Sequence, residues 1–302
     1  MVADLLAHTV AAQHEQPLAQ QVLGWRAAMR RSLNKLPLET LVQQGPMVTA
    51  SAILQASNAQ LAHITYPFLA AFRQAGTSTA TRGLPMHPSV LRKASLSFSF
   101  DEVNPYTVQA ATSLRDNLVR WFSTTQALAI STAVSQGLMD GLAPKTIADQ
   151  LGDVLGLNNQ QAQAVVNKRR ALEAQGLPQN RINALMQDYS NQAASARAIT
   201  VARTEALRAA NAGQDASVRQ FDMDVFNAGL EVRRFWDYTH DNRTRPDHRA
   251  IPGLNPDGVG INEPFKYPGG RSIMLPGDLN ADADMTINCR CCVLHRLYKR
   301  SS

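Results

Sequence analysis

Apolar residues recur at helical spacing from about residue 105 to residue 212, and no other feature of the sequence constrains the fold so strongly. Leu114, Leu118 and Trp121 lie three or four positions apart, so a helix places all three on one face. Aromatic residues make up only 6% of the chain, and the alanine, glutamine, serine and asparagine that replace them favour helices joined by polar turns. With 44% hydrophobic residues among 302, the chain can bury a core, so the pattern predicts packed helices.

Proline and asparagine mark the points at which new helices are expected. Pro144 suits the first turn of a helix, and the side chain of Asn158 can cap the helix that follows it. Between residues 38 and 104 glycine and proline interrupt the pattern more often, and alternation over residues 96–100 predicts a short strand. We therefore predict a mostly helical region over residues 1–195, which can be subdivided near residue 104.

The pattern changes after Leu230. Residues 231–238 alternate and are rich in branched and aromatic side chains, which predicts a strand, and residues 292–297 predict a last short one. Turn-forming residues dominate between residues 241 and 288. We therefore expect the helical region to be followed by a small, loop-rich α+β domain over residues 196–302.

Charge and the character of the first residues limit the cellular location and the partners. The net charge is +6, and 15 of the 30 basic and 11 of the 24 acidic residues precede residue 196, so the excess is spread out. Such a distribution permits contact with DNA but does not require it, because dedicated nucleic-acid domains concentrate charge on one face. The first basic residue is Arg26, and no apolar stretch reaches membrane-spanning length, so we expect neither a signal peptide nor a membrane partner.

The three cysteines, Cys289, Cys291 and Cys292, lie in one segment, which favours a reducing cytoplasm over an oxidised secreted scaffold. Zinc binds four nitrogen or sulfur ligands in a tetrahedron, which His248, Cys289 and Cys291 can supply together with His295 or Cys292. In the other interpretation, the cysteines at 289 and 291 are small buried residues that strand alternation points to one side. The sequence leaves both interpretations open.

Residues 144–171 have the outline of a helix-turn-helix, in which basic side chains of the second helix can contact DNA. The candidates are Lys168, Arg169 and Arg170. The alternative is ordinary helix packing with a solvated basic face.

Arg203 and Glu205 lie two positions apart in an alanine-rich helix, so they do not share a face. Unless this helix is simply exposed, we expect such charges to reach partners elsewhere, for example near Asp237 or Asp241.

No motif predicts an enzyme. His248, Asn288 and His295 occur in the order found in one nuclease class, but about forty residues between the first two fit its compact finger poorly. Phosphate-binding loops, nucleophile elbows and paired zincin histidines do not occur in the sequence.

Six short motifs follow one another over the last hundred residues. They are Ala202-Arg203-Thr204-Glu205, the strand with Trp236, Asp241-x-Arg243-Thr244-Arg245-x-x-His248, Pro264-Phe265, Pro276-Gly277-Asp278 and Asn288-Cys289-Arg290-Cys291. In this order and spacing, residues 195–297 resemble the phage Mu F-like, or head morphogenesis, family of minor head proteins. The helices from about residue 135 resemble it more loosely.

This resemblance implies a minor component of a tailed bacteriophage head that acts near the portal in head assembly, DNA packaging or DNA delivery. The implied partners are the portal protein or the inner capsid surface, reached through the helical region, and phage DNA, bound weakly and without sequence preference. The implied location is the virion, with the host cytoplasm during assembly. The motif residues would have a structural role and require no cofactor. The alternatives are a DNA-processing enzyme that uses His248 and a sequence-selective DNA-binding protein built on residues 144–171.

Overall fold

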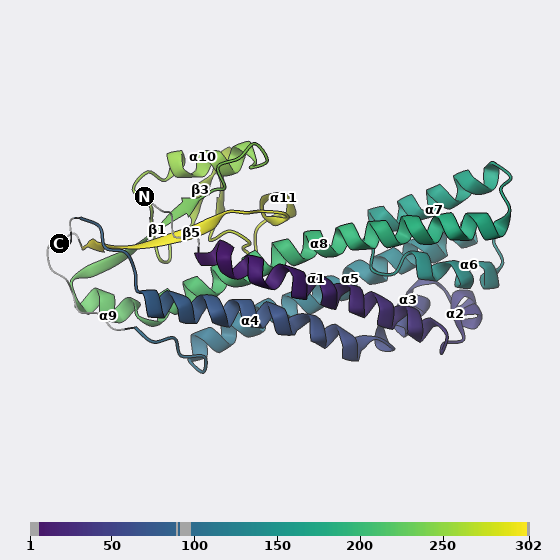
Figure 1. Cartoon of the computed structure of the whole chain (residues 1–302), viewed down its shortest axis with the longest axis horizontal. Coiled ribbons are helices and arrows are strands. Elements are labelled where there is room, and N and C mark those ends of the chain that lie inside the picture. The colour runs from purple at the N-terminus through teal and green to yellow at the C-terminus, as the bar shows by residue number, and fades with distance from the viewer. Residues whose placement is uncertain (1–5, 89, 91–97, 301–302) are drawn as a thin grey trace. The chain divides into compact units, whose positions relative to one another are not determined.

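The computed structural model describes residues 6–88, 90 and 98–300 (Figure 1). Long helices dominate the first part of the chain, and two small antiparallel sheets with connecting loops form the last part, which confirms the predicted fold class. The helices are α1 (Leu6–Leu33), α2 (Leu38–Gln44), α3 (Pro46–Gln55), α4 (Asn58–Arg82), α5 (Pro105–Met139), α6 (Pro144–Gln150), the short η1 (Leu151–Asp153), α7 (Asn159–Ala174), α8 (Gln179–Gln220) and α9 (Asp222–Asn227).

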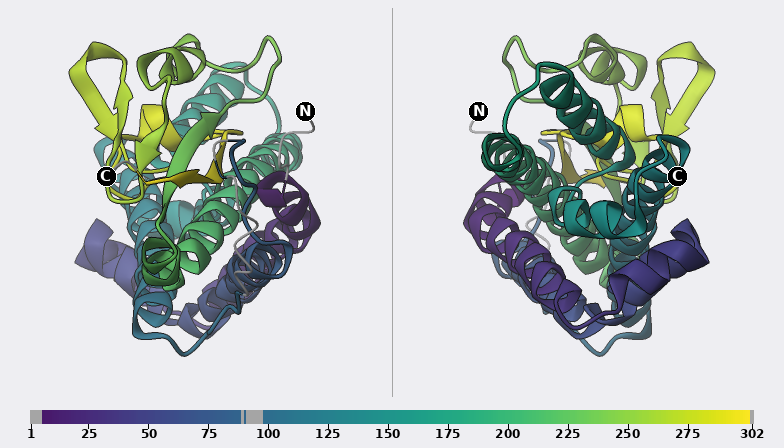
Figure 2. Two further views of the ribbon diagram at one scale, coloured as in Figure 1. Left: turned by 90° about the vertical axis from the view of Figure 1, so that its left-hand side faces the viewer. Right: turned by 90° about the vertical axis from the view of Figure 1, so that its right-hand side faces the viewer.

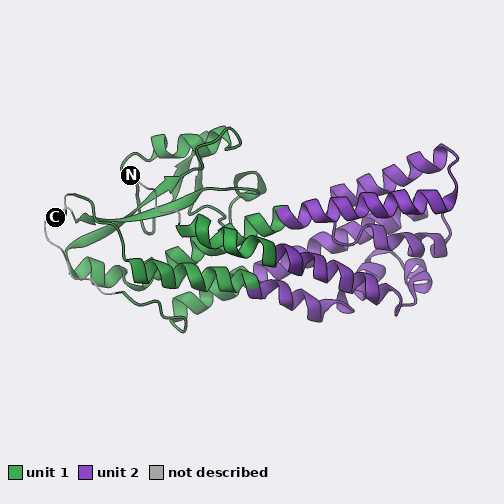
Figure 3. Ribbon diagram, viewed as in Figure 1, with its two compact units in different colours: residues 1–17, 67–115, 200–302 green, residues 18–66, 116–199 purple. Residues whose placement is uncertain are grey.

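The chain forms two compact units, each assembled from separate segments (Figure 3). Unit 1 contains residues 1–17, 67–115 and 200–302, and unit 2 contains residues 18–66 and 116–199. Helix α8 passes without a break through residue 196, where the sequence predicted a domain boundary. The division of the chain into folding domains therefore stays a prediction.

Local signals placed three helix starts correctly. Helices α5 and α6 begin at Pro105 and Pro144, and Asn158 caps α7. The Asn158 side chain accepts a hydrogen bond from the Gln161 backbone (2.9 Å), and the Gln161 side chain accepts one from the Asn158 backbone (3.2 Å). This reciprocal capping box satisfies two amides that the first turn of a helix leaves unpaired.

The strand predicted over residues 96–100 lies partly outside the described residues. Phe98 and Phe100, which are described, belong to no strand. Phe98 stacks on Phe221 with ring centroids 4.0 Å apart, and Phe100 packs edge-on against Phe72 at 6.3 Å. In unit 1 Phe98 therefore packs at the junction between α8 and α9, where Phe221 lies, and Phe100 packs against α4.

A three-stranded antiparallel sheet organises the C-terminal part of unit 1. Its central strand β1 (Leu230–Asp237) pairs with β5 (Cys292–Lys299) and with β2 (Val259–Gly260), and β1 and β5 lie side by side in Figure 2. Both long strands lie within two residues of their predicted bounds. The remaining elements are β3 (Phe265–Tyr267) and β4 (Arg271–Ile273), which form a hairpin, and the short helices α10 (Pro246–Leu254), η2 (Pro268–Gly270) and α11 (Ala283–Thr286).

Alternation along β1 decides which side chains enter the core of unit 1. Every second residue of the strand is buried, so Trp236 joins Ile251 of α10, Phe265 of β3 and Val293 of β5 in one hydrophobic cluster. Helix α8 also packs closely in this unit. A Cβ atom on Gly213 would lie 2.1 Å from the carbonyl oxygen of Phe72 on α4, so only glycine fits there.

Unit 2 is a helical body whose core includes buried hydrogen bonds. Trp25 packs edge-on against Phe122 with ring centroids 5.4 Å apart. Arg26 is buried beside them and donates to the Leu155 carbonyl (2.7 Å) and the Ser190 hydroxyl (2.7 Å). Among the described helices, none combines the length and the apolar character that crossing a membrane requires.

Candidate functional site

The loop after β1 is closed by a charged pair. Both carboxylate oxygens of Asp241 accept hydrogen bonds from the Arg290 guanidinium, at 2.6 and 2.7 Å. The backbone amides of Arg243 and Thr244 donate to the same carboxylate, at 3.0 and 3.1 Å, and shape the turn. The Arg290 guanidinium holds the pKa of the Asp241 carboxyl well below its ordinary value.

The hydroxyl of the buried Thr244 strengthens this closure by donating to the Thr239 carbonyl, and the Thr239 hydroxyl donates to the Arg290 carbonyl at 2.8 Å. Arg245 donates to the Ile287 carbonyl. The run from residue 241 to residue 245 is thus fastened to the segment before β5 by side chains and backbone alike.

Asn288 has a conformational role in that segment. It is the only non-glycine residue with a positive φ (57°) in the described part of the chain, and asparagine tolerates this left-handed conformation better than most residues. Its backbone amide donates to the Thr204 hydroxyl of α8 at 3.0 Å. The turn at Asn288 is therefore bonded to the long helix.

His248, Cys289 and Cys291 lie together next to these contacts, since the two cysteines flank Arg290 in the sequence. All three are buried, and their ligand atoms lie within 4.8 Å of one another. Nδ1 of His248 is 3.3 Å from the Cys291 sulfur and 3.6 Å from the Cys289 sulfur, and the Cys291 backbone amide donates to the Cys289 sulfur at 3.4 Å. A hydrogen bond from the Cys291 thiol lowers the pKa of Cys289, with help from His248, whereas that bond and burial raise the pKa of Cys291.

Aromatic rings fix the orientation of the histidine. The His248 ring packs edge-on against Trp236 and Tyr267, with centroids 5.7 and 5.9 Å away. Its Nε2 atom is buried and has no hydrogen-bond partner among the described residues. The polar contacts of the ring are thus on the side of the two sulfurs.

The structure does not bring His295 into this cluster. His295 lies on β5 opposite Arg234, and its Nε2 is 3.9 Å from the Asp215 carboxylate of α8. It therefore cannot act as the nearby fourth zinc ligand that the sequence allowed. Cys292 is also outside the cluster, because strand alternation turns its sulfur toward Asp237, at 3.8 Å.

Sequence reasoning missed a second buried group in this region. Arg234 is fully buried and donates to the carbonyls of Met274 (2.9 Å), Gly260 (3.2 Å) and Glu263, and it lies 3.6 Å from Asp215. The signal was present in the sequence. The alternation that turns Trp236 inward also turns Arg234 inward, two residues earlier.

Arg203 and Glu205 do not pair with each other, but the predicted partners near Asp237 or Asp241 are wrong: only Arg203 reaches another element, and Glu205 pairs within α8. Arg203 pairs with Glu15 of α1 at 2.8 Å. Glu205 is buried against Arg208 (2.7 Å), which also donates to the Gly277 carbonyl at 2.7 Å. Burial raises the pKa of Glu205, and Arg208 opposes this effect.

The family model described as Phage Mu protein F like protein matches residues 129–294, which is more than half of the chain. The chain belongs to this family. The match begins within α5 and ends within β5. It therefore includes the helices from residue 129 onward and most of the C-terminal part with the two small sheets. No curated protein and no solved structure matched the chain. Membership connects the chain to phage head morphogenesis.

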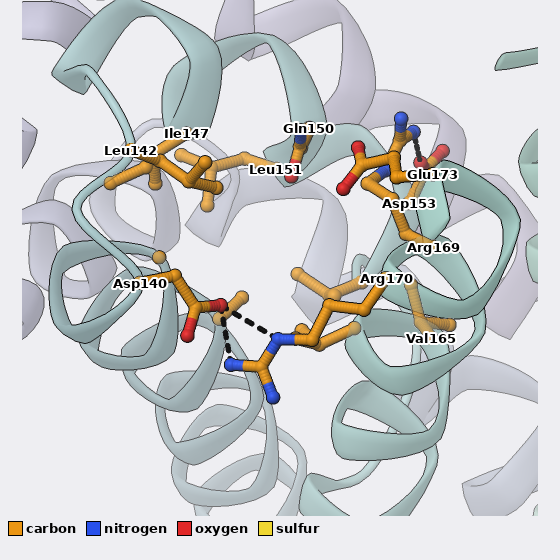
Figure 4. Close-up of a pocket in the computed structure, with 14 residues that line it drawn as sticks. Asp140, Leu142, Ile147, Gln150, Leu151, Asp153, Val165, Arg169, Arg170 and Glu173 are labelled. Carbon is orange, nitrogen blue, oxygen red and sulfur yellow. Dashed lines mark hydrogen bonds and ion pairs between the residues drawn. The ribbon is translucent and has the colours of Figure 1, made fainter. Parts of the chain in front are cut away.

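The helical half of the Phage Mu F-like region contains a pocket of about 380 Å³, shown in Figure 4. Arg170 of α7 binds Asp140 at one side of this pocket, and the buried Arg169 binds Asp153 (2.8 Å) at the other. Of the three predicted DNA contacts, only Lys168 is exposed. The two arginines hold α7 against its neighbours in unit 2.

Proposed function

We propose that this Phage Mu F-like chain is a minor head protein of a tailed bacteriophage, which acts near the portal during head assembly, DNA packaging or DNA delivery. The observation that carries the proposal is the family match over residues 129–294, combined with the internal use of the motif residues. Asp241, Arg290 and Asn288 all hold the fold together, as described above.

The buried position of His248 favours this role over a DNA-processing enzyme. Only 1% of the residue is exposed, and its ring nitrogens are enclosed by sulfurs and aromatic rings. A general base must lie within hydrogen-bond reach of the proton that it removes, and a DNA backbone cannot approach this ring. If the chain were a DNA-processing enzyme, it would nick plasmid DNA in a metal-dependent way, and His248→Ala would abolish this activity. We expect the wild-type chain and the His248→Ala variant to show the same background level of nicking.

Weak DNA contact without sequence preference suits the spread-out charge. The net charge of +6 gives a mild attraction to phosphates. Arg169 and Arg170 form ion pairs with Asp153 and Asp140 of the same chain. A sequence-selective protein built on residues 144–171 would need these side chains in the major groove. We expect binding to unrelated duplexes to be equally weak and to fall steeply with salt.

The proposed partner is the portal protein or the inner capsid surface, contacted through the helical region. Large apolar side chains are available for such a contact in unit 2, where Met47, Tyr66 and Met139 are 67%, 64% and 72% exposed. The deciding experiment is co-expression with the portal protein of the same genome, read by native mass spectrometry. A complex with few copies per portal ring supports the proposal. Absence of a complex, and absence of the chain from purified particles, would overturn it.

A further inference from the structure

The distances within the group formed by His248, Cys289 and Cys291 match those of a metal site. In tetrahedral zinc sites the bonds to sulfur and nitrogen are about 2.3 and 2.0–2.1 Å, which places neighbouring nitrogen and sulfur ligands about 3.6 Å apart. The observed separations between Nδ1 of His248 and the two sulfurs are 3.3 and 3.6 Å. Both nitrogen-to-sulfur separations are therefore close to those of a tetrahedral site, and the two sulfurs lie within 4.8 Å of each other.

We propose that the chain binds one zinc ion through Nδ1 of His248 and the thiolates of Cys289 and Cys291. This site is independent of the proposed role in the phage head. It joins α10, which carries the histidine, to the start of β5, which the two cysteines precede. The metal would thus add a second link to the segment before β5, next to the one that Asp241 and Arg290 form.

Local structure presents the ligands in the required way. Cys289 and Cys291 are separated by one residue, and both sulfurs reach the same histidine nitrogen, whereas the sulfur of Cys292 turns away. The Cys291 backbone amide already donates to the Cys289 sulfur, an arrangement that stabilises a thiolate. The edge-on packing of Trp236 and Tyr267 keeps the imidazole aimed at the sulfurs.

Charge balance in this buried place favours a divalent soft metal. Two thiolates side by side away from water repel each other, and a zinc ion neutralises both. Carboxylates are not part of the group, which disfavours magnesium or calcium. The fourth corner is left to a water molecule or another ligand from solution, because only three protein donors among the described residues form the group.

Two other states of the same residues are possible outcomes of a test. The thiols can remain protonated and bonded to each other, or Cys289 and Cys291 can be oxidised to a disulfide. Neither state holds a metal. A count of reactive thiols in denaturant separates them, because the disulfide leaves only Cys292 to react, whereas the reduced form exposes three thiols.

The first experiment measures the metal content of the full-length chain, purified without chelators or an affinity tag that binds metals. We expect about one zinc ion per chain, released together with a loss of thermal stability when a strong chelator is added. X-ray absorption at the zinc edge should show two sulfur ligands. A folded chain that is free of metal, and that binds neither added Zn²⁺ nor Co²⁺, would overturn the proposal.

The second experiment compares variants, with the neighbouring cysteine as a matched control. Cys289→Ser and Cys291→Ser should each lower the zinc content at least about tenfold and remove the sulfur-to-cobalt charge-transfer band of the Co²⁺ form. Cys292→Ser, which changes an adjacent buried cysteine, should keep both. Loss of zinc from Cys292→Ser alone would place the site elsewhere and overturn the assignment. If the ligand variants do not fold, the absorption spectrum of the wild-type chain decides: fewer than two sulfurs at the zinc would contradict the site.

Discussion

The Arg290 guanidinium donates two hydrogen bonds, of 2.6 and 2.7 Å, to the Asp241 carboxylate, although 49 positions separate the two residues in the sequence. The pair connects the loop after β1 to the segment before β5, in which Arg290 lies between Cys289 and Cys291. Two paired hydrogen bonds between charged groups fix orientation as well as distance. Both residues also belong to the motifs by which the sequence resembles its family.

Removal of the Asp241 charge should lower the melting temperature, because Arg290 then loses its charged acceptor. The pKa of Asp241 is depressed in the folded state, so the pair contributes its full stability above the ordinary pKa of 3.8 and loses it as pH falls toward the folded value. The difference in melting temperature between wild type and Asp241→Asn should therefore be constant near neutral pH and shrink in acid. The control is Arg243→Gln. The Arg243 side chain is 75% exposed, so this substitution should change the melting temperature little. A difference that grows in acid would contradict the assignment.

Replacement of Arg234 by methionine should destabilise the fold strongly. The change leaves three carbonyl acceptors without their buried donor and removes the buried positive charge that lies 3.6 Å from Asp215, which together cost about 3–5 kcal/mol. Arg233→Met is the matched control on the opposite face of β1, where the half-buried pair with Glu231 is worth about 1 kcal/mol or less. Urea unfolding followed by circular dichroism measures both. If the two variants lost the same unfolding free energy, the buried hydrogen bonds of Arg234 would not contribute the stability assigned to them.

Two glycines inside helices should respond to alanine with opposite signs. At Gly213 a Cβ atom would meet the Phe72 carbonyl at 2.1 Å, so Gly213→Ala should lower the unfolding free energy by about 1–3 kcal/mol or more. At Gly24 a Cβ atom meets nothing within 4 Å, so Gly24→Ala should raise it by about 0.5–1 kcal/mol through helix propensity. Thermal melts of the two variants test the close approach of α8 and α4, and a stabilising Gly213→Ala would refute it.

Arg169 and Lys168 are neighbours in α7 with different expected roles. Arg169→Gln removes the buried contacts with Asp153 (2.8 Å) and Asn183 (3.0 Å) and should cost about 2 kcal/mol or more. Lys168→Gln should leave stability unchanged and weaken DNA binding slightly and equally for all sequences. Melting curves and salt-dependent binding to two unrelated duplexes distinguish them. A loss of sequence preference on changing Lys168 would favour the rival DNA-reading function.

Much of the local structure was determined by the sequence itself. The capping box at Asn158 involves residues only three positions apart, so its hydrogen bonds depend on local geometry alone. The alternation of β1 likewise determines which residues face the core. Even the meeting of Cys289 and Cys291 follows from their spacing, and the order of the motifs was enough to indicate the family, which the match to residues 129–294 confirms.

Only the tertiary structure decided which distant groups become partners. Arg203 finds Glu15, which is 188 positions away, and His295 faces Asp215 and lies outside the cysteine group that includes His248. No local pattern encodes these choices, because they depend on how helices and strands far apart in sequence are packed. The buried Asp215 takes the complementary groups that packing brings within a few ångströms, since leaving a buried charge unpaired costs several kcal/mol at order of magnitude.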